Sequence, residues 1–229
     1  MPAEPHLDIE KLKLIVDCLV AIGTIACAIT AVFGSDIRSL RFRPEFSLSI
    51  RGPFKSPLKV RDGNKDIEVT AYLSMLNIRN IGNQDAKNVE VFVSGLEVEL
   101  ADGTFKKQEE FPALNLRWAH LNFTFADVIR PGMQRDCDFS VIVKREGLPP
   151  GCEWYNKKLS KVPGDTNLGF QFIFLPFTRD YVVGPGKYRL LGQVAAKNTK
   201  PKDFTLELNH TGHWFEDEQA MSSKGLGIL

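Results

Sequence analysis

The chain has 229 residues, of which 43% are hydrophobic and 25% are charged, and its formal net charge is +1. This composition is ordinary for a globular protein. The balance of charges argues against a general polyanion binder, so we expect no nucleic-acid partner. Sixteen phenylalanines against four methionines and three tryptophans indicate a core built largely from β-strands.

An apolar segment, residues 14–33, stands near the start of the chain and reads LIVDCLVAIGTIACAITAVF. As a helix it would be about 30 Å long, which matches the hydrocarbon core of a bilayer. Asp17 is its only charge, and polar sequence begins at once on both sides. We therefore predict a polar tail over residues 1–13 and a transmembrane helix over residues 14–34, with the lipid bilayer as the first partner.

A cleaved signal peptide and a lipoprotein signal are two alternatives to this membrane anchor. A cleaved signal peptide has a basic start and a short apolar core, whereas residues 1–13 carry three acidic residues against two lysines. The stretch ending at Cys27 resembles a lipoprotein cleavage site, but six more apolar residues follow it. Neither pattern fits as well as an uncleaved helix.

The predicted helix has one face of small residues. At about 100° per residue, the positions within about 40° of Asp17 form a stripe on one side of the helix. Its members are Asp17, Ala21, Thr24, Ala28 and Ala31. Small residues let helices approach closely in lipid, and an intramembrane carboxylate usually faces a partner or water. We therefore predict that this stripe associates with a second copy, giving a homo-oligomer, or with another membrane protein. The alternative is that small residues are common in any spanning helix and that Asp17 merely lies near one end.

Residues 35–45 form a basic neck after the helix. Arg38, Arg41 and Arg43 alternate with apolar residues, as in a segment lying on anionic headgroups. A simple stop-transfer flank explains the same residues, and Pro44 is expected to end the helix. Four arginines, including Arg51, follow the span, and two lysines precede it. Because the side of a span that is richer in Lys and Arg is usually cytoplasmic, the large domain is predicted to be cytoplasmic.

Strand patterns dominate the rest of the chain. Residues 67–80 alternate in period two with a change of phase, which indicates a bulge or burial on both faces. Gly52, Pro53 and Pro57 are expected to break the first strand, and residues 101–104 (ADGT) to form a hairpin turn. The predicted strands cover residues 46–50, 67–80, 89–100, 116–125, 137–143, 169–175, 187–195 and 204–208. We predict an all-β antiparallel sandwich over residues 46–214, then a tail with a short helix over residues 215–229 whose last residues fray.

Residues 71–95 carry a strand–loop–strand pattern marked by Asn80, Gly82, Ala86, Asn88 and Val89. The pattern resembles bacterial immunoglobulin-like domains of the cell-adhesion-related type. Residues 187–215 are similar to the closing hairpin of small membrane-anchored bacterial proteins of uncharacterised role. The resemblance implies an immunoglobulin-like sandwich at the bacterial inner membrane and carries no catalytic residue. Residues 149–163 depart from the simple seven-strand pattern.

Several side chains are candidates for chemistry, each with a simpler structural interpretation. His210 and His213 precede an acidic run, but their spacing fixes no third metal ligand, so a structural role is favoured. His120 is interpreted as a histidine on a sheet face. Cys137 and Cys152 are more often reduced than paired at such a spacing.

Two further clusters have structural interpretations. Phe170, Phe172 and Phe174 alternate and are interpreted as core rather than as a base-stacking surface. Three lysines in residues 157–161 form a basic loop that is solvated by default.

No nucleotide-binding loop, nucleophile elbow or zinc-protease helix occurs in the sequence. We therefore expect no catalytic residue, no cofactor and no metal. The first functional hypothesis is a membrane-anchored binding or scaffolding module. The alternative is a membrane effector of a stress or phage-defence system, whose helices oligomerise to disturb the bilayer when the soluble domain senses a ligand or partner. A membrane-bound hydrolase, which would need an undetected site, is the least favoured.

Overall fold

The computed structural model describes residues 9–119, 123–176 and 178–228, and for residues 9 and 35–41 it describes the backbone alone. The chain divides into two compact units, Met1–Arg43 and Pro44–Leu229. The first unit contains α1 (Ile9–Arg41), which continues seven residues beyond Gly34. The second unit contains the β-structure and is called the domain below.

The domain is built from strands with a few helical turns near its C-terminus. The elements in chain order are β1 (Phe46–Asp62), β2 (Lys65–Asn80), β3 (Ala86–Glu99), β4 (Phe105–Lys107), β5 (Leu114–Asn115), β6 (Arg117–Trp118), β7 (Phe125–Ile129), β8 (Gln134–Lys144), η1 (Lys157–Leu159), β9 (Thr166–Phe170), β10 (Val182–Val183), β11 (Gly186–Ala196), β12 (Thr199–His210), α2 (Glu218–Ala220), η2 (Met221–Gly225) and β13 (Leu226–Ile228).

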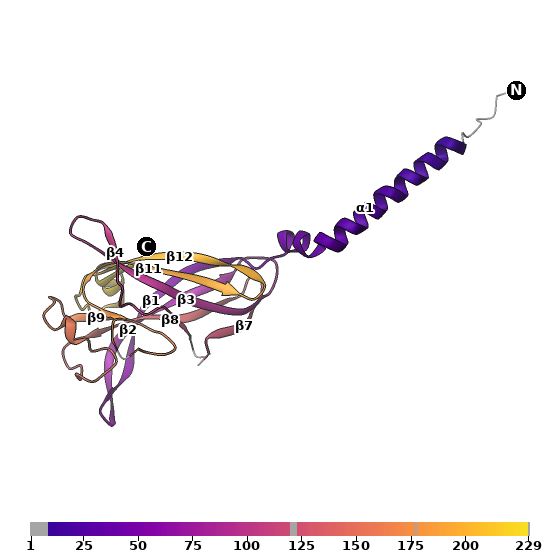
Figure 1. The fold of residues 1–229 in the computed structure, drawn as a ribbon. Helices are drawn as coiled ribbons and strands as arrows, with labels where there is room; N and C mark the ends of the chain where they lie inside the picture. The colour runs from indigo at the N-terminus through magenta and orange to yellow at the C-terminus, as the bar shows by residue number, and fades with distance from the viewer. Residues whose placement is uncertain (1–8, 120–122, 177, 229) are drawn as a thin grey trace. The chain divides into compact units, whose positions relative to one another are not determined.

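The described strands form two sheets, both antiparallel in every described pairing (Figure 1). One sheet has the order β1-β2-β8-β9-β10, with β6 also on β8. The other has the order β13-β12-β11-β3-β4, with β5 and β7 also on β3. The predicted all-β antiparallel class after an N-terminal apolar helix is therefore confirmed.

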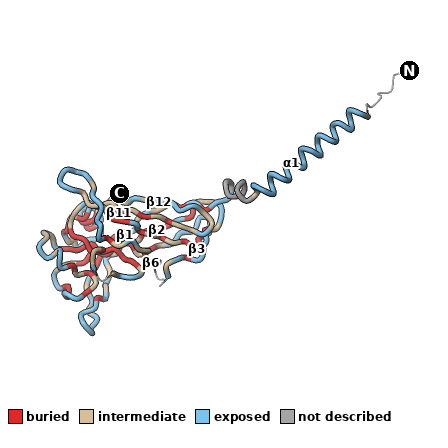
Figure 2. The backbone as a smooth tube through the Cα atoms, in the orientation of Figure 1, coloured by how far each residue is buried: buried red, intermediate tan, exposed pale blue. Residues whose placement is uncertain are grey.

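Buried side chains from both sheets form one hydrophobic cluster (Figure 2). Its largest fully buried members include Tyr72 on β2, Trp118 on β6, Phe139 on β8 and Phe170 on β9. Phe139 and Phe170 meet edge to face, with ring centroids 5.9 Å apart. Burying an aromatic or large aliphatic side chain stabilises a fold by roughly 1.5–3 kcal/mol, so this shared cluster holds the two sheets together.

The first strand differs from the prediction, because Gly52, Pro53 and Pro57 do not end it. Strand β1 continues past them through a shift of register between Arg51 and Phe54. Gly52 adopts φ 103° there, and the Gly52–Pro53 bond is cis. The prolines are tolerated because β1 pairs only with β2, and an edge strand does not need every N–H for its ladder.

The phase change predicted within residues 67–80 corresponds to burial on both faces of β2, because the consecutive residues Leu76, Asn77 and Ile78 are all buried. The partner strand β8 carries a bulge beside this part of β2. Ser74 pairs with Ser140, but Met75 pairs with Asp138, so β8 carries one extra residue. That extra residue is Phe139, whose side chain is fully buried. The bulge therefore brings a large aromatic ring into the core at the point where the pattern of β2 changes phase.

The ADGT turn is also confirmed, and it connects β3 to β4. The Thr104 carbonyl accepts from the Leu100 N–H at 2.8 Å, and Gly103 adopts φ 81°. The Asp102 carboxylate accepts from the Thr104 hydroxyl at 2.6 Å and from its N–H at 2.9 Å. These hydrogen bonds lower the pKa of Asp102. A second tight turn at Gly63, where φ is 59°, joins β1 to β2.

The last residues differ from the predicted tail, because they belong to the domain. The predicted short helix is present as α2 and η2, but β13 follows it and pairs with β12. Met221 and Leu226 are buried in the common core. The Met221 side chain lies so close to Gly225 that a Cβ there would come within 2.5 Å of its sulfur. Apolar residues at alternating positions of a short strand anchor this segment instead of letting it fray.

The residues that carried the immunoglobulin-like resemblance shape one end of the domain. Asn80 is fully buried, and its amide uses every hydrogen-bonding position that it has. Its oxygen accepts from the N–H groups of Glu45 at 3.3 Å and Gly82 at 3.0 Å, and its nitrogen donates to the carbonyls of Gln84 at 2.7 Å and Ile129 at 2.9 Å. Asn80 therefore fastens three segments of the chain together.

The remaining residues of that pattern lie at the start of β3. Ala86 and Val89 are fully buried, and Asn88 adopts φ 50°. Asparagine is one of the few residues that enters this left-handed region readily, so it suits the irregular start of β3.

Candidate functional site

Residues Glu10–Phe33 of α1, which include its apolar segment, are exposed (Figure 2). The part from Glu10 to Gly34 is long and apolar enough to cross a membrane, and none of it is buried. Its large aliphatic side chains expose about half to two thirds of their surface, from 47% at Ile29 to 67% at Val32. An apolar helix of this length with no protein cover needs an apolar environment, which a bilayer supplies.

The predicted stripe lies on this helix. Because α1 is continuous from Ile9 to Arg41, its five stripe positions share one face. The Thr24 hydroxyl donates to the Val20 carbonyl at 2.8 Å, so it is satisfied within the helix. At Gly23, beside the stripe, an added Cβ would meet nothing within 4 Å. The stripe is therefore a smooth surface of small side chains with the Asp17 carboxylate toward one end, and its association stays a prediction.

The basic neck is only partly described. The side chains of Arg38 and Arg41 lie outside the described residues, and Arg43 is exposed. The helix ends at Arg41, three residues before Pro44. A proline disfavours helical backbone at the residue before it, so the helix ends slightly earlier than the proline itself.

A strap formed by residues 214–218 crosses β1, β2 and β8, and the sequence did not indicate it. Glu216 accepts from Lys55 Nζ at 2.6 Å, Lys144 Nζ at 2.9 Å and Trp214 Nε1 at 2.8 Å. These hydrogen bonds, of which that from Lys55 is strongest, lower the pKa of Glu216 to about 2. The buried Tyr72 hydroxyl donates to the Glu216 carbonyl at 3.0 Å, which fixes the strap to the sheet.

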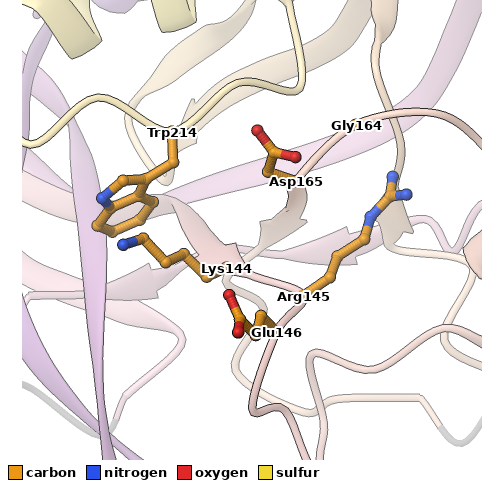
Figure 3. A pocket seen from close by; sticks show the side chains of 6 residues that line it. All are labelled: Lys144, Arg145, Glu146, Gly164, Asp165 and Trp214. Atoms are coloured by element: carbon orange, nitrogen blue, oxygen red, sulfur yellow. The ribbon is translucent and has the colours of Figure 1, made fainter.

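A cleft of about 420 Å³ opens beside this strap (Figure 3). Its lining residues are Lys144, Arg145, Glu146, Gly164, Asp165 and Trp214. Figure 3 shows Lys144 reaching toward the Trp214 ring, 4.7 Å from its centroid, while the guanidinium of Arg145 points the other way. The cleft mixes both signs of charge. Lys144 pairs with Glu216, and Arg145 donates to Asn167 Oδ1 at 2.7 Å. Both cations of the cleft therefore make contacts within the domain.

Two further cavities are also lined by charged side chains that pair with one another. Lys158, from the predicted basic loop, forms ion pairs with Glu110 at 2.5 Å and Asp180 at 2.9 Å beside a cavity of about 210 Å³. The hydrogen bond that Lys158 donates to Glu110 is the largest cause of the raised pKa of Lys158. A third cavity, of about 470 Å³, is bordered by Phe105 and Arg189, whose guanidinium lies 3.8 Å from the ring centroid.

The structure separates the two histidines considered as metal ligands. His210 is buried, with Nε2 2.9 Å from the Thr166 hydroxyl and Nδ1 3.0 Å from the Gly184 carbonyl. Burial lowers its pKa to about 4. His213 is exposed and lies 3.7 Å from Asp165. Within the described residues, no group of three or more His, Cys, Asp or Glu side chains is placed to hold a metal ion.

The aromatic and cysteine predictions had mixed outcomes. Phe170 and Phe172 are buried core residues as predicted, but Phe174 is 72% exposed and the prediction for it was wrong. Strand β9 ends at Phe170, so the alternation does not continue to Phe174. Cys137 and Cys152 are both buried free thiols, and burial raises the pKa of each.

His120 lies outside the described residues. No protein-family model matches the chain, and no curated protein matches it by sequence.

Proposed function

We propose that the protein is a single-pass membrane-anchored binding or scaffolding module, in which α1 spans the bilayer and the domain presents surfaces to partners. The observation that carries the proposal is the contrast between the two units. The helix exposes an apolar surface of bilayer length, whereas the domain from Pro44 onward has a closed core of its own. Several charged side chains beside the described cavities form ion pairs, such as Lys144 with Glu216, Lys158 with Asp180 and Arg189 with Glu207.

The strand order supports an immunoglobulin-like sandwich for the domain. The neighbours β1-β2-β8 follow the order of strands A, B and E of that fold, and β12-β11-β3 follow the order G, F and C. Strands β9 and β10 extend the first sheet beside β8, where strand D lies in that fold. They follow β8 in the chain, however, whereas strand D precedes strand E. Domains of this architecture act mainly through their surfaces and loops, which fits a binding role.

Membrane anchoring is tested by washing membranes that contain the full chain with alkaline carbonate. The wild-type protein is expected to stay in the pellet. A variant with Ile22→Arg and Ile25→Arg places two charges in the span, each costing about 2.5–3.5 kcal/mol at the centre of a bilayer, and is expected in the supernatant. Release of the intact wild-type chain would refute the anchor.

Association through the stripe is tested with a membrane two-hybrid assay. Ala21→Leu with Ala28→Leu fills the small-residue face and is expected to reduce the signal at least severalfold. Ile15→Phe with Ile22→Phe adds comparable bulk to the opposite face and is the matched control, which should leave the signal unchanged. Equal signals from both variants would show that the stripe is not the contact surface.

The predicted inner-membrane location, with a cytoplasmic domain, is tested with an introduced thiol. Cys137 and Cys152 are buried and so are poor reporters, whereas Leu100 is 42% exposed. In spheroplasts, a membrane-impermeant maleimide should label Leu100→Cys only after the membrane is permeabilised. Labelling before permeabilisation would place the domain outside.

The effector alternative is favoured by one feature, the Asp17 carboxylate, which is exposed within the apolar part of α1. A carboxylate on a helix face that assembles in lipid can line a water-filled path. If the protein disturbs the bilayer, its overexpression should cause dye leakage that Asp17→Leu abolishes. Absence of leakage leaves the scaffolding role as the better account.

A further inference from the structure

Four segments of the chain meet at the end of the domain where Pro44 lies. They are residues 44–46, 81–85, 130–133 and 196–199, and this region is called the Pro44 end. The Glu45 carbonyl accepts from the Ile81 N–H at 2.7 Å. The Met133 carbonyl accepts from the Asn80 N–H at 3.0 Å, and the Pro44 carbonyl accepts from the Thr199 hydroxyl at 3.4 Å. Chain connectivity and hydrogen bonds therefore place these loops together.

Two asparagines make the Pro44 end a rigid platform. Asn80 fastens three of the segments, as described above. Asn198 completes the fourth, since its nitrogen donates to the Asp85 carbonyl at 2.8 Å and its oxygen accepts from the Lys87 N–H at 3.1 Å. The backbones of these loops are consequently tied to one another, which lowers the cost of ordering the loops when a surface binds.

The platform carries apolar side chains surrounded by cations. Ile81 and Met133 are 52% and 53% exposed on two of the loops that meet at the Pro44 end. Lys87, Arg130 and Lys197 are exposed around them, and the Lys87 carbonyl accepts from the Lys197 N–H at 2.9 Å. None of these three cations forms an ion pair with another residue of the described ranges.

Some cations on other faces of the domain are neutralised, since Lys55 and Lys144 both pair with Glu216, and Lys187 pairs with Glu99 at 3.0 Å. The acidic residues in and beside the loops of the Pro44 end are Glu45, Asp127 and the half-buried Asp85. Exposed apolar side chains together with unneutralised cations suit a membrane leaflet with acidic headgroups. Such a leaflet presents anionic groups at its surface and an apolar layer beneath them.

The covalent chain limits how far this platform can lie from the predicted span. Helix residues from Gly34 to Arg41 add about 10 Å beyond the apolar segment, and three residues to Pro44 add at most about 11 Å. The headgroup layer itself extends about 5–8 Å beyond the hydrocarbon on each side. A platform that begins at Pro44 is therefore within reach of the headgroups, whereas the β3–β4 turn lies a full strand length away.

We propose that the Pro44 end docks on acidic lipid headgroups, with Ile81 and Met133 entering the interface and Lys87, Arg130 and Lys197 lying over phosphates. The inference rests on the proposed membrane anchoring and deepens it, because it gives the domain one orientation on the bilayer. The opposite end of the domain, including the β3–β4 turn, then faces away from the lipid and is free for partners.

The test uses the full chain in nanodiscs and a fluorescent label at Met133→Cys. Cys18 and Cys27 are exposed and are replaced by serine, while the buried Cys137 and Cys152 stay. Nanodiscs contain either phosphatidylcholine alone or a mixture with phosphatidylglycerol, together with a lipid that carries a nitroxide quencher on its headgroup. Incorporation into the disc reports on the anchor separately from quenching of the label.

A label at Leu100→Cys, which is 42% exposed beside the β3–β4 turn, is the positional control. In phosphatidylglycerol discs, quenching at position 133 is expected to be at least three times that at position 100. The difference should shrink in phosphatidylcholine discs and at high salt, because exposed charges are screened within about 3 Å at 1 M salt.

Charge reversal at Lys87, Arg130 and Lys197, each to glutamate, should bring quenching at position 133 to the level of position 100. Each cation near an acidic leaflet contributes about fivefold in binding, so three removals weaken docking about 100-fold or more. Reversal of Lys65, Lys106 and Lys107 makes the same change in net charge on exposed residues elsewhere and should have no effect.

Three outcomes would overturn the proposal. Equal quenching at positions 133 and 100 in an incorporated protein would show that the Pro44 end is not the docked surface. Loss of quenching with the control reversal would show that net charge alone attracts the domain. Strong quenching that persists in phosphatidylcholine discs would remove the role of acidic headgroups. Failure of the chain to enter nanodiscs at all would instead refute the membrane anchor.

Discussion

The buried imidazole of His210 is expected to make the stability of the domain depend on pH in a range where few other groups titrate. A carbonyl oxygen can only accept, so Nδ1 must donate to the Gly184 carbonyl, and Nε2 then accepts from the Thr166 hydroxyl. The neutral ring satisfies both partners. Burial lowers the pKa of His210 to about 4, and the charge of Arg145 acts in the same direction.

The sign of the effect follows from proton binding in the two states. Above the ordinary pKa of 6.5, His210 is neutral whether the chain is folded or not, and its contribution to stability is fully present. As the pH falls below 6.5 the unfolded chain takes up a proton that the folded domain does not, so stability is lost down to about pH 4. The loss is about 1 kcal/mol between roughly pH 7.5 and 5.5, and about 3 kcal/mol in total.

The assay is denaturant unfolding of the full chain in detergent at several pH values, followed by tryptophan fluorescence. All three tryptophans lie in the domain, so the signal reports its unfolding rather than that of α1. His210→Gln replaces the ring by a neutral amide and should remove most of the slope between roughly pH 7.5 and 5.5. The lowered pKa values of Asp102 and Glu216 confine their titration to more acidic solutions. A variant that keeps the wild-type slope would refute the reasoning.

Three other changes test the packing and the polar contacts. Asn80→Ala leaves up to four backbone groups without their partner and should lower the free energy of unfolding by at least about 2 kcal/mol in the same assay. Gly169→Ala brings a Cβ within 2.6 Å of two ring carbons of Trp154 and should cost about 1–3 kcal/mol, whereas Gly151→Ala, where a Cβ meets nothing within 4 Å, should stay within about 0.5 kcal/mol. Glu216→Gln weakens the strap, which should appear as faster hydrogen exchange in residues 214–218 with the rest of the domain unchanged.

Local patterns predicted the parts of the fold that local physics determines. The apolar run over residues 14–33 indicated the long helix, and the Asp-Gly pair indicated the turn at Gly103, because both depend on neighbouring residues alone. The change of phase in β2 indicated its burial on both faces, but the bulge beside Ser74 lies in β8, and the sequence did not show that Phe139 is the extra residue.

The errors share a physical cause, which is the position of a segment within the sheets. Pro53 was expected to end β1, but it lies on an edge strand where a missing N–H costs little. Phe174 was assigned to the core from alternation, but the strand stops before it. The strap around Glu216 depends on Lys55 and Lys144, which lie 161 and 72 residues away in the chain, so no local pattern could indicate it.

If α1 anchors the protein in a membrane, as proposed above, the free edges of the two sheets become important, because molecules held in one plane meet at high effective concentration. The outer edge of β12 before Leu208 has no described strand partner, but it carries Lys200, Pro201 and Lys202, which oppose pairing with another chain. The edge of β1 is interrupted at Pro53, and the Lys55 N–H beyond it donates to Glu218 at 2.7 Å. Since the long edges of β1 and β12 resist strand addition, we expect any self-association of this protein to use the helix stripe, where small side chains favour close approach.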